Sequence, residues 1–340
     1  MYVLESVMKF VKRILIFIIA FVGISCDAES NPNSIVFFTD DPFVNENSEY
    51  IIVLGDIQEY TNEEAYYPYF QATMEWIWNK IKDGKNIKCV LQTGDITWTN
   101  QHYQYNIFYK YTYPVALEIP YISCPGNHDY SYSNGYIKNR YSTLFSQYTS
   151  FDNVNQLVVD RYEEGRMENI IVKNEINGER IDIVSLEYGA RTEVIEWAKQ
   201  HIRNNPDIRY IILTHEFLTS KGKIIQDQES YAYIDLARGE STYSGPVYIW
   251  NNLIKDNNNI VCVLCGHHGF SAHLFTKNSF GREVPQILFN LQYQDNGGDG
   301  WVQLWEFPKN SDFANVNTYN TITREYHPDS NHSFKFKYKI

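Results

Sequence analysis

From residue 50 onward the chain alternates short apolar runs with amphipathic stretches, and this alternation limits the fold more than any other feature. The apolar runs are rich in Ile, Val and Leu without strict alternation, which is typical of strands buried on both faces of a sheet. Strands alternating with helices predict an α/β fold with inner sheet and outer helices. Because no repeat and no linker follows residue 48, we expect one domain over residues 49–340.

The apolar runs expected to form strands are Tyr50–Leu54, Ile87–Thr93, Tyr121–Cys124, Ile170–Val172, Arg180–Leu186, Arg209–Thr214, Ile260–Cys265 and Gln286–Gln292. The stretches expected to form helices are Glu63–Asp83, Ile137–Tyr148, Thr192–Asn204 and Val247–Asp256. Thr192–Asn204 carries an apolar stripe at helical spacing. The tail adds two strand-like runs that would complete a second sheet, Trp301–Phe307 and Ser333–Ile340.

Residue types that bind metal ions follow five of these strands, in the segments Gly55-Asp56-Ile57-Gln58, Gly94-Asp95, Gly126-Asn127-His128-Asp129, Thr214-His215-Glu216 and Gly266-His267-His268-Gly269. In open α/β sheets the carboxyl ends of the strands form the ligand crevice, so these side chains can converge. Carboxylates, an amide oxygen and imidazoles suit borderline divalent ions such as Zn, Fe and Mn. They are too many for one ion, and two ions sharing a bridging carboxylate would use them all.

This order of motifs resembles the calcineurin-like metallophosphoesterases, whose signature is GD, GD, GNH-acid, His and GH-x-His; the resemblance spans about residues 50–270. It implies a four-layer α/β/β/α sandwich with a dinuclear metal centre. The function implied is metal-dependent hydrolysis of phosphomonoesters or phosphodiesters, with a hydroxide activated by two metals as the nucleophile.

Carried over residue by residue, the resemblance implies the following metal ligands: Asp56 for the first ion, Asp95 as the bridge, and Asn127, His215 and His267 for the second ion. It further implies that His128 is the general acid that protonates the leaving oxygen. Asp129 would hold the imidazole of His128.

The sequence departs from the family pattern twice, and both departures affect the first metal. Gln58 stands where the family has a His, so we expect its amide oxygen to be a ligand in an oxygen-only site that favours harder ions such as Mn or Mg. Gly269 stands where the family has a second ligand His. His268 would replace that ligand, contact substrate, or be a structural residue.

Three further motifs resemble an exported bacterial subgroup of the family: the GD-x-Q start, Ser185–Glu193, and an N-x-Q-x-x-x-N-G-G segment at residues 290–298. Within the second, Arg191 would either pair with a substrate phosphate bidentately or lie on the surface at a helix start. The glycine-rich loop at residues 296–300 is explained by turn formation alone.

The N-terminus predicts export. Basic residues precede the apolar run Ile14–Ile24, which is too short for an ordinary membrane span and ends near Cys26 in a sequence that resembles a lipobox. We expect residues 1–26 to be a lipoprotein-type signal with Cys26 lipidated, and residues 27–48 to be a flexible tether. The protein would then be membrane-anchored, periplasmic or on the cell surface. The alternative is a simple cleaved signal with Cys26 a spare cysteine.

A net charge of −12 repels polyanions, so we expect no binding to a nucleic-acid backbone. The expected partner is a phosphorylated small molecule or a phosphodiester. An aromatic content of 16% fits either platforms for sugars or bases, or merely a Tyr-rich core and surface. The second hypothesis for function is a surface lipoprotein that binds a ligand on a degenerate metallophosphoesterase fold.

Overall fold

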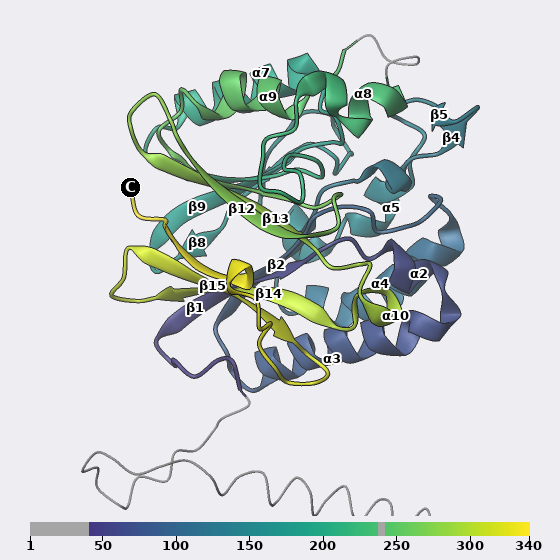
Figure 1. The fold of residues 1–340 in the computed structure, drawn as a ribbon, viewed down its shortest axis with the longest axis vertical. Helices are drawn as coiled ribbons and strands as arrows, with labels where there is room; N and C mark the ends of the chain where they lie inside the picture. The colour runs from purple at the N-terminus through teal and green to yellow at the C-terminus, as the bar shows by residue number, and fades with distance from the viewer. Residues whose placement is uncertain (1–40, 237–241) are drawn as a thin grey trace, which may run out of the picture. The chain divides into compact units, whose positions relative to one another are not determined.

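Two β-sheets pack face to face in the computed structural model, which describes residues 41–236 and 242–340. Figure 1 shows the layers in order: helices α7 and α9, the sheet that holds β9, β12 and β13, the sheet that holds β1, β14 and β15, and helices α3 and α4. This arrangement confirms the predicted four-layer α/β/β/α sandwich.

The first sheet has the strand order β16-β15-β14-β1-β2-β3, and the second has the order β12-β13-β11-β10-β9-β7-β6, with β8 paired to β9. The strands of the first sheet are β1 Ser48–Leu54, β2 Ile87–Gln92, β3 Tyr121–Ser123, β14 Trp301–Pro308, β15 Phe313–Asn320 and β16 Ser333–Lys337. Those of the second are β6 Val158–Arg161, β7 Ile170–Val172, β8 Glu175–Ile176, β9 Glu179–Ser185, β10 Arg209–Leu213, β11 Ile260–Cys265, β12 Phe270–Lys277 and β13 Glu283–Asn290. A small hairpin pairs β4 Tyr132–Ser133 with β5 Tyr136–Ile137.

The α-helices are α2 Gln58–Asn62, α3 Tyr67–Lys82, α4 His102–Ala116, α5 Phe145–Thr149, α6 Asp152–Asn155, α7 Thr192–Asn204, α8 Tyr231–Leu236, α9 Pro246–Ile249 and α10 Asp295–Gly298. A π-helix, η4 Trp250–Ile254, continues α9. Short 3₁₀ turns are η1 Glu64–Tyr66, η2 Asn127–Asp129, η3 Asp227–Glu229 and η5 Ser330–His332.

The central strands β10 and β11 of the second sheet are buried on both faces, as their continuous apolar runs predict. Ile211 and Leu213 of β10 enter the core between the two sheets, whereas Tyr210 and Ile212 enter the core under α7. In β11, Cys262 and Cys265 lie in these two different cores, so they cannot form a pair. The parallel pairings β1–β2–β3 and β9–β10–β11–β13 bring the carboxyl ends of these strands to the same edge of the sandwich.

The helix prediction for Ile137–Tyr148 is wrong except at its end, where α5 begins at Phe145. Arg140 is buried there and donates to the backbone carbonyls of Tyr188 and Gly189, and these tertiary contacts hold an irregular backbone. Helix α4 was not predicted, because its Tyr-rich sequence contains Pro114 and shows no clean stripe.

The signal segment, Cys26 and residues 27–40 of the expected tether lie outside the described residues. Residues 41–47 contact the domain, since Phe43 is buried against Tyr50 and Trp76. The domain boundary at residue 49 therefore stays a prediction. Contacts with the domain begin a few residues earlier, at Phe43. Across 41–236 and 242–340, none of the helices has the length and apolar character of a membrane span.

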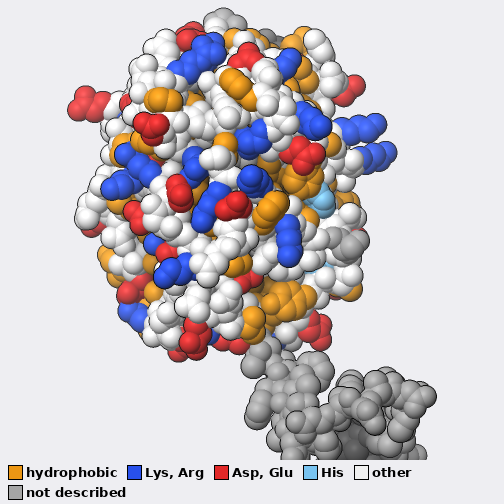
Figure 2. All heavy atoms as spheres, turned by 90° about the vertical axis from the view of Figure 1, so that its left-hand side faces the viewer, with side chains coloured by type: hydrophobic (Ala, Val, Ile, Leu, Met, Phe, Trp, Pro, Cys, Tyr) orange, Lys and Arg blue, Asp and Glu red, His pale blue; other side chains and the backbone are white. Residues whose placement is uncertain are grey.

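On the face drawn in Figure 2, acidic and basic side chains are interspersed rather than gathered into patches of one sign. This face therefore offers no continuous basic surface to a polyanion.

Candidate metal centre

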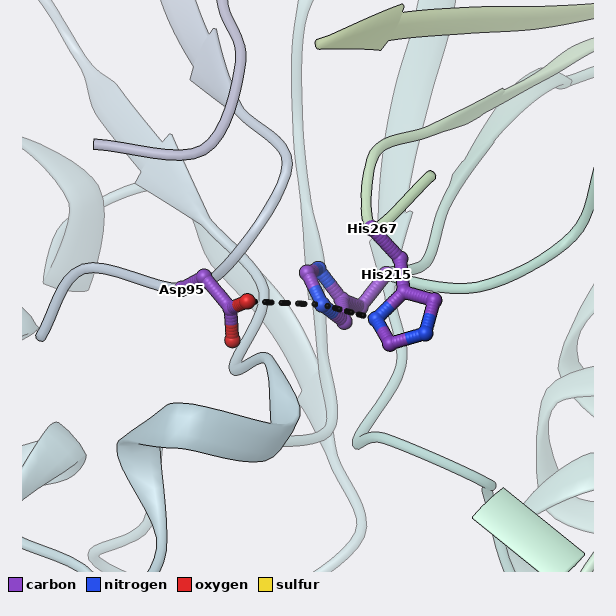
Figure 3. A group of neighbouring side chains, drawn as sticks. All are labelled: Asp95, His215 and His267. Carbon is purple, nitrogen blue, oxygen red and sulfur yellow. Dashed lines mark hydrogen bonds and ion pairs between the residues drawn. The ribbon is translucent and has the colours of Figure 1, made fainter. Parts of the chain in front are cut away.

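The metal-binding residue types predicted from the sequence meet at the edge where both sheets end. Asp56, Asp95 and Asn127 follow β1, β2 and β3 of the first sheet, and His215 and His267 follow β10 and β11 of the second. In Figure 3 the side chains of Asp95, His215 and His267 point toward one another from three separate loops. Each half of the chain therefore contributes one side of the site.

Four of these side chains surround a common point. Oδ1 of Asn127 lies 3.2 Å from Nε2 of His215 and 3.1 Å from Nδ1 of His267. The same Nε2 of His215 lies 3.3 Å from Oδ2 of Asp95 and 3.1 Å from Nδ1 of His267. Two oxygens and two imidazole nitrogens that face each other at this spacing form a mixed ligand set for a borderline divalent ion. The residues predicted for the second metal thus fit such an ion.

The electrostatics of this cluster favour a positive charge at its centre. Burial alone would lower the pKa of His215, but the Asp95 and Asp56 carboxylates outweigh burial and raise it to about 10. Burial would raise the pKa of Asp95, whereas the imidazoles of His215 and His128 hold it below its usual range. The pKa of His267 is lowered by its burial and by its neighbour His215. The buried carboxylates and imidazoles of this cluster therefore perturb one another, and a bound cation would offset the charge of the carboxylates.

The backbone brings these ligands together through tight approaches. The backbone φ is 51° at Asp95 and 68° at His267, and residues other than Gly rarely adopt positive φ values. A Cβ on Gly126 would lie 2.1 Å from Oδ1 of Asp95, so only glycine fits between the β2 and β3 loops. The carbonyl of Thr93 lies 2.7 Å from Nδ1 of His215, which directs Nε2 of His215 into the cluster.

The first half-site is built around Asp56, which is buried among hydrogen-bond donors. Its carboxylate accepts bonds from the backbone N–H of His267 at 3.1 Å and from Asn290 Nδ2 at 2.6 Å, and Gln292 Nε2 lies 3.5 Å away. Burial raises the pKa of Asp56, the His215 charge opposes this, and the Asp95 carboxylate adds to it. Gln58 donates to Asp95 Oδ2 at 3.2 Å.

Sequence reasoning assigned no role to Asn290 or Gln292. The position of polar residues at the carboxyl end of an apolar strand would have indicated them, because Asn290 ends β13 and Gln292 lies two residues beyond it.

The position of the missing second histidine is filled by an aromatic ring. A Cβ on Gly269 would lie 2.5 Å from the ring of Tyr293, so a larger side chain there would displace that ring. The ring of His268 faces Glu216: its Nε2 lies 3.9 Å from Oε1 of Glu216, and its ring stands beside Tyr231. Glu216 is buried and accepts bonds from Ser230 Oγ and from the backbone of α8.

The predicted contact between Asp129 and the ring of His128 is wrong. The carboxylate of Asp129 accepts bonds from the backbone N–H groups of Ile96, Thr97 and Gly126. Nδ1 of His128 instead lies 2.9 Å from the carbonyl of Trp98, and the two rings stack with centroids 4.7 Å apart. Trp98 therefore orients His128, and Asp129 holds the loops that carry the cluster.

The guanidinium of Arg191 forms ion pairs with two glutamates of the protein. It pairs with Glu187 at 2.8 Å and with Glu163 at 3.1 Å, and it lies over the ring of Tyr162. Of the two readings of Arg191, these contacts favour the structural one, because every guanidinium nitrogen already has a carboxylate partner.

The chain belongs to the calcineurin-like phosphoesterases, whose family model matches residues 50–328. It is 26% identical over 288 residues to the uncharacterized protein YvnB of Bacillus subtilis, covering 80% of this chain and 20% of that protein. Over 96 residues it is 31% identical to a probable inactive purple acid phosphatase 27 of Arabidopsis thaliana, covering 27% of this chain and 16% of that one. The chain thus spans a fifth or less of the length of these curated relatives.

Among solved structures, the purple acid phosphatase PPD1 of yellow lupin shares the fold, with a TM-score of 0.53 and 15% identity over 86% of this chain and 54% of that one. Proteins of this family are typically dependent on two metal ions.

Proposed function

We propose that this protein hydrolyses phosphomonoesters or phosphodiesters, with His128 as the general acid. The observation that carries the proposal is the cluster of Asp95, Asn127, His215 and His267, whose ligand atoms face one point beside a half-buried imidazole. A site that had lost its chemistry would have no reason to keep this geometry beside an acid.

Bound divalent ions would supply Lewis acidity toward the phosphoryl oxygens and a water of lowered pKa. The protein would hold these ions through the cluster and through Asp56. Nδ1 of His128 is engaged with the carbonyl of Trp98, so Nε2 is the nitrogen left to deliver a proton. Stacking on Trp98 fixes the plane of the ring, and the proton passes from Nε2 to the departing oxygen.

Exposed aromatic side chains border the cluster and suggest the kind of substrate. Trp98 stacks on His128, Tyr132 contacts Asn127 through its hydroxyl, Tyr231 stands 5.0 Å from the ring of His267, and Tyr293 packs on Gly269. All four are at least 38% exposed, so their rings are accessible to a ligand. We propose that they receive a planar group, such as a nucleobase or an aryl ring, on the substrate.

The test of activity combines metal analysis with turnover of an aryl phosphate by the full protein. We expect bound divalent metal and turnover that a chelator abolishes. The control is His215→Ala, which removes a cluster ligand and should lose metal and activity together. A well-folded protein that binds metal but hydrolyses neither a monoester nor a diester would instead favour a binding module on this fold.

The test of the substrate class compares a nucleoside 5′-monophosphate with ribose 5-phosphate, because both release a primary alkoxide and differ by the base. Stacking contributes roughly 1–3 kcal/mol per base, so Tyr231→Ala should lower kcat/KM for the nucleotide about tenfold and leave ribose 5-phosphate unchanged. Phe313→Leu, an exposed aromatic on β15, is the matched control. Equal kcat/KM for the two substrates in the unaltered protein would exclude base recognition.

We also propose that Cys26 anchors the protein to a membrane after export. Support comes from the basic residues and the apolar run Ile14–Ile24 that precede it. Attached acyl chains contribute about 0.8 kcal/mol per buried methylene, so the protein should sediment with membranes and Cys26→Ala should not. Unaltered protein found free in the exported soluble fraction would contradict the anchor.

A further inference from the structure

Two buried amide oxygens at the first half-site have no hydrogen-bond partner. They are Oε1 of Gln58 and Oε1 of Gln292, on side chains that are 1% and 4% exposed. A buried carbonyl oxygen without a partner costs about 1–3 kcal/mol, so it calls for an explanation. Both amides lie against the buried carboxylates Asp56 and Asp95.

Each of these two amides directs its NH₂ group at a buried carboxylate. Gln58 Nε2 donates to Asp95 at 3.2 Å, and Gln292 Nε2 lies 3.5 Å from Asp56, so the positive end of each amide faces a negative charge. Rotating either amide by half a turn about its last bond exchanges NH₂ and oxygen. Because the oxygens have no partner to lose, only the contact with the carboxylate opposes this rotation, and a bound cation would favour it.

Asn290 shows that not every amide here is free to rotate. Its Oδ1 accepts the backbone N–H of Gln292 at 3.0 Å, while its Nδ2 donates to Asp56 at 2.6 Å. Both ends are satisfied, so Asn290 is a fixed donor that orients Asp56. Of the amides that contact Asp56 or Asp95, Gln58 and Gln292 are the two with an orphaned oxygen.

One imidazole contacts this half-site, because Nε2 of His215 lies 3.3 Å from Oδ2 of the shared carboxylate Asp95. Among the described residues, His267 touches Asp56 through its backbone N–H, and its ring nitrogens face Asn127 and Glu216. The ring of His268 faces Glu216, and Gly269 has no side chain to offer. Apart from His215 on the shared Asp95, the ligand atoms that the described side chains offer beside Asp56 are therefore oxygens.

We propose that Gln58 and Gln292 turn their amide oxygens inward to complete an oxygen-only site for the first metal ion, together with Asp56 and Asp95. The proposal rests on the metal centre of the proposed function and gives the N-x-Q segment a role: Asn290 orients Asp56 and Gln292 binds the ion. Carboxylate and amide oxygens select hard ions such as Mn²⁺ or Mg²⁺, whereas the nitrogen-rich second site selects Zn or Fe. The two positions therefore hold different metals.

The experiment is titration of metal-stripped full-length protein with Mn²⁺ alone, followed by electron paramagnetic resonance and calorimetry, and separately with Zn²⁺. We expect Mn²⁺ to fill one class of site and Zn²⁺ to bind tightest at another. Gln292→Leu should weaken the Mn²⁺ class about 10- to 100-fold and leave tight Zn²⁺ binding unchanged. Gln292→Glu should tighten the Mn²⁺ class, and Gln58→His should shift it toward Zn²⁺.

Gln286→Leu is the matched control, since it removes a fully buried amide from β13, the strand that leads to Gln292, and its partners lie away from the cluster. Mn²⁺ affinity that is the same in Gln292→Leu as in the unaltered protein would overturn the proposal. So would two sites of equal affinity that both prefer Zn²⁺. Because the readout is metal binding, these outcomes differ from a failure of the proposed function, which would appear as bound metal without hydrolysis of either ester.

Discussion

Replacing Asp129 by Asn tests whether this carboxylate supports the loops or the acid. Oδ2 of Asp129 accepts the backbone N–H groups of Ile96 at 3.2 Å and Gly126 at 2.9 Å. Oδ1 accepts the N–H of Thr97 at 3.0 Å and the hydroxyls of Thr97 and Tyr105. The backbone donors cannot turn away, so in Asp129→Asn the new NH₂ group is best placed on the Thr97 side, where the hydroxyls can rotate.

That placement leaves one buried backbone N–H without an acceptor, which costs about 1–3 kcal/mol. The oxygen that remains in Asp129→Asn still accepts from Ile96 and Gly126, but these two hydrogen bonds are weaker because the acceptor is no longer charged. The loss is roughly 1 kcal/mol for the two bonds together. The sum is about 3 kcal/mol. With an unfolding entropy of about 2 cal/mol/K per residue over a domain of roughly 300 residues, Tm should fall by about 5 °C.

The assay is urea unfolding together with turnover of two substrates, one with an activated aryl leaving group and one with an alkyl leaving group. If Asp129 supports the loops, stability falls and turnover drops equally for both substrates, because Asp95 and Asn127 shift together. Unchanged stability, with a loss confined to the alkyl ester, would refute this reasoning. It would return Asp129 to the role of orienting His128.

His128→Ala should keep its metal and lose about 10²–10⁴-fold in turnover of alkyl esters but much less for aryl esters; equal losses would remove His128 from the acid role. Gly266→Ala should lower metal content, because its Cβ would lie 2.2 Å from Oδ1 of Asp56; metal analysis that matches the unaltered protein would contradict this. Burial and the stacked ring of His327 lower the pKa of His332 to about 4, so folding favours the neutral ring. That contribution to stability is complete above about pH 6.5 and is lost as pH falls toward 4. The free energy of unfolding should therefore fall less between pH 7 and pH 5 in His332→Gln than in the unaltered protein, by roughly 1 kcal/mol. Urea unfolding at the two pH values measures this difference.

The alternation of strands and helices predicted an α/β fold, and the resemblance to the family implied the four-layer sandwich. The convergence of Asp95, Asn127, His215 and His267 follows from a local rule: a polar ligand directly after a buried strand. The same rule applied to β13 would have added Asn290 and Gln292. It failed for Asp129, since adjacency in sequence does not say which way a side chain turns on a 3₁₀ turn. The rule did not decide the role of Arg191. That role depends on ion pairs with Glu163 and Glu187, which form only in the folded structure.

The loop at residues 290–300 leaves the second sheet and enters the first, passing through five consecutive residues of positive φ from Asn296 to Gly300. It is anchored at one end by Asn290 on Asp56 and at the other by the backbone N–H of Gly300 on the Tyr60 hydroxyl. Ions held between the β1–β3 loops and the β10–β13 loops would therefore act as a removable staple between the two sheets. Binding at a thousand times the dissociation constant adds about 4 kcal/mol to the free energy of unfolding, so availability of metal would set how long the domain resists unfolding and proteolysis.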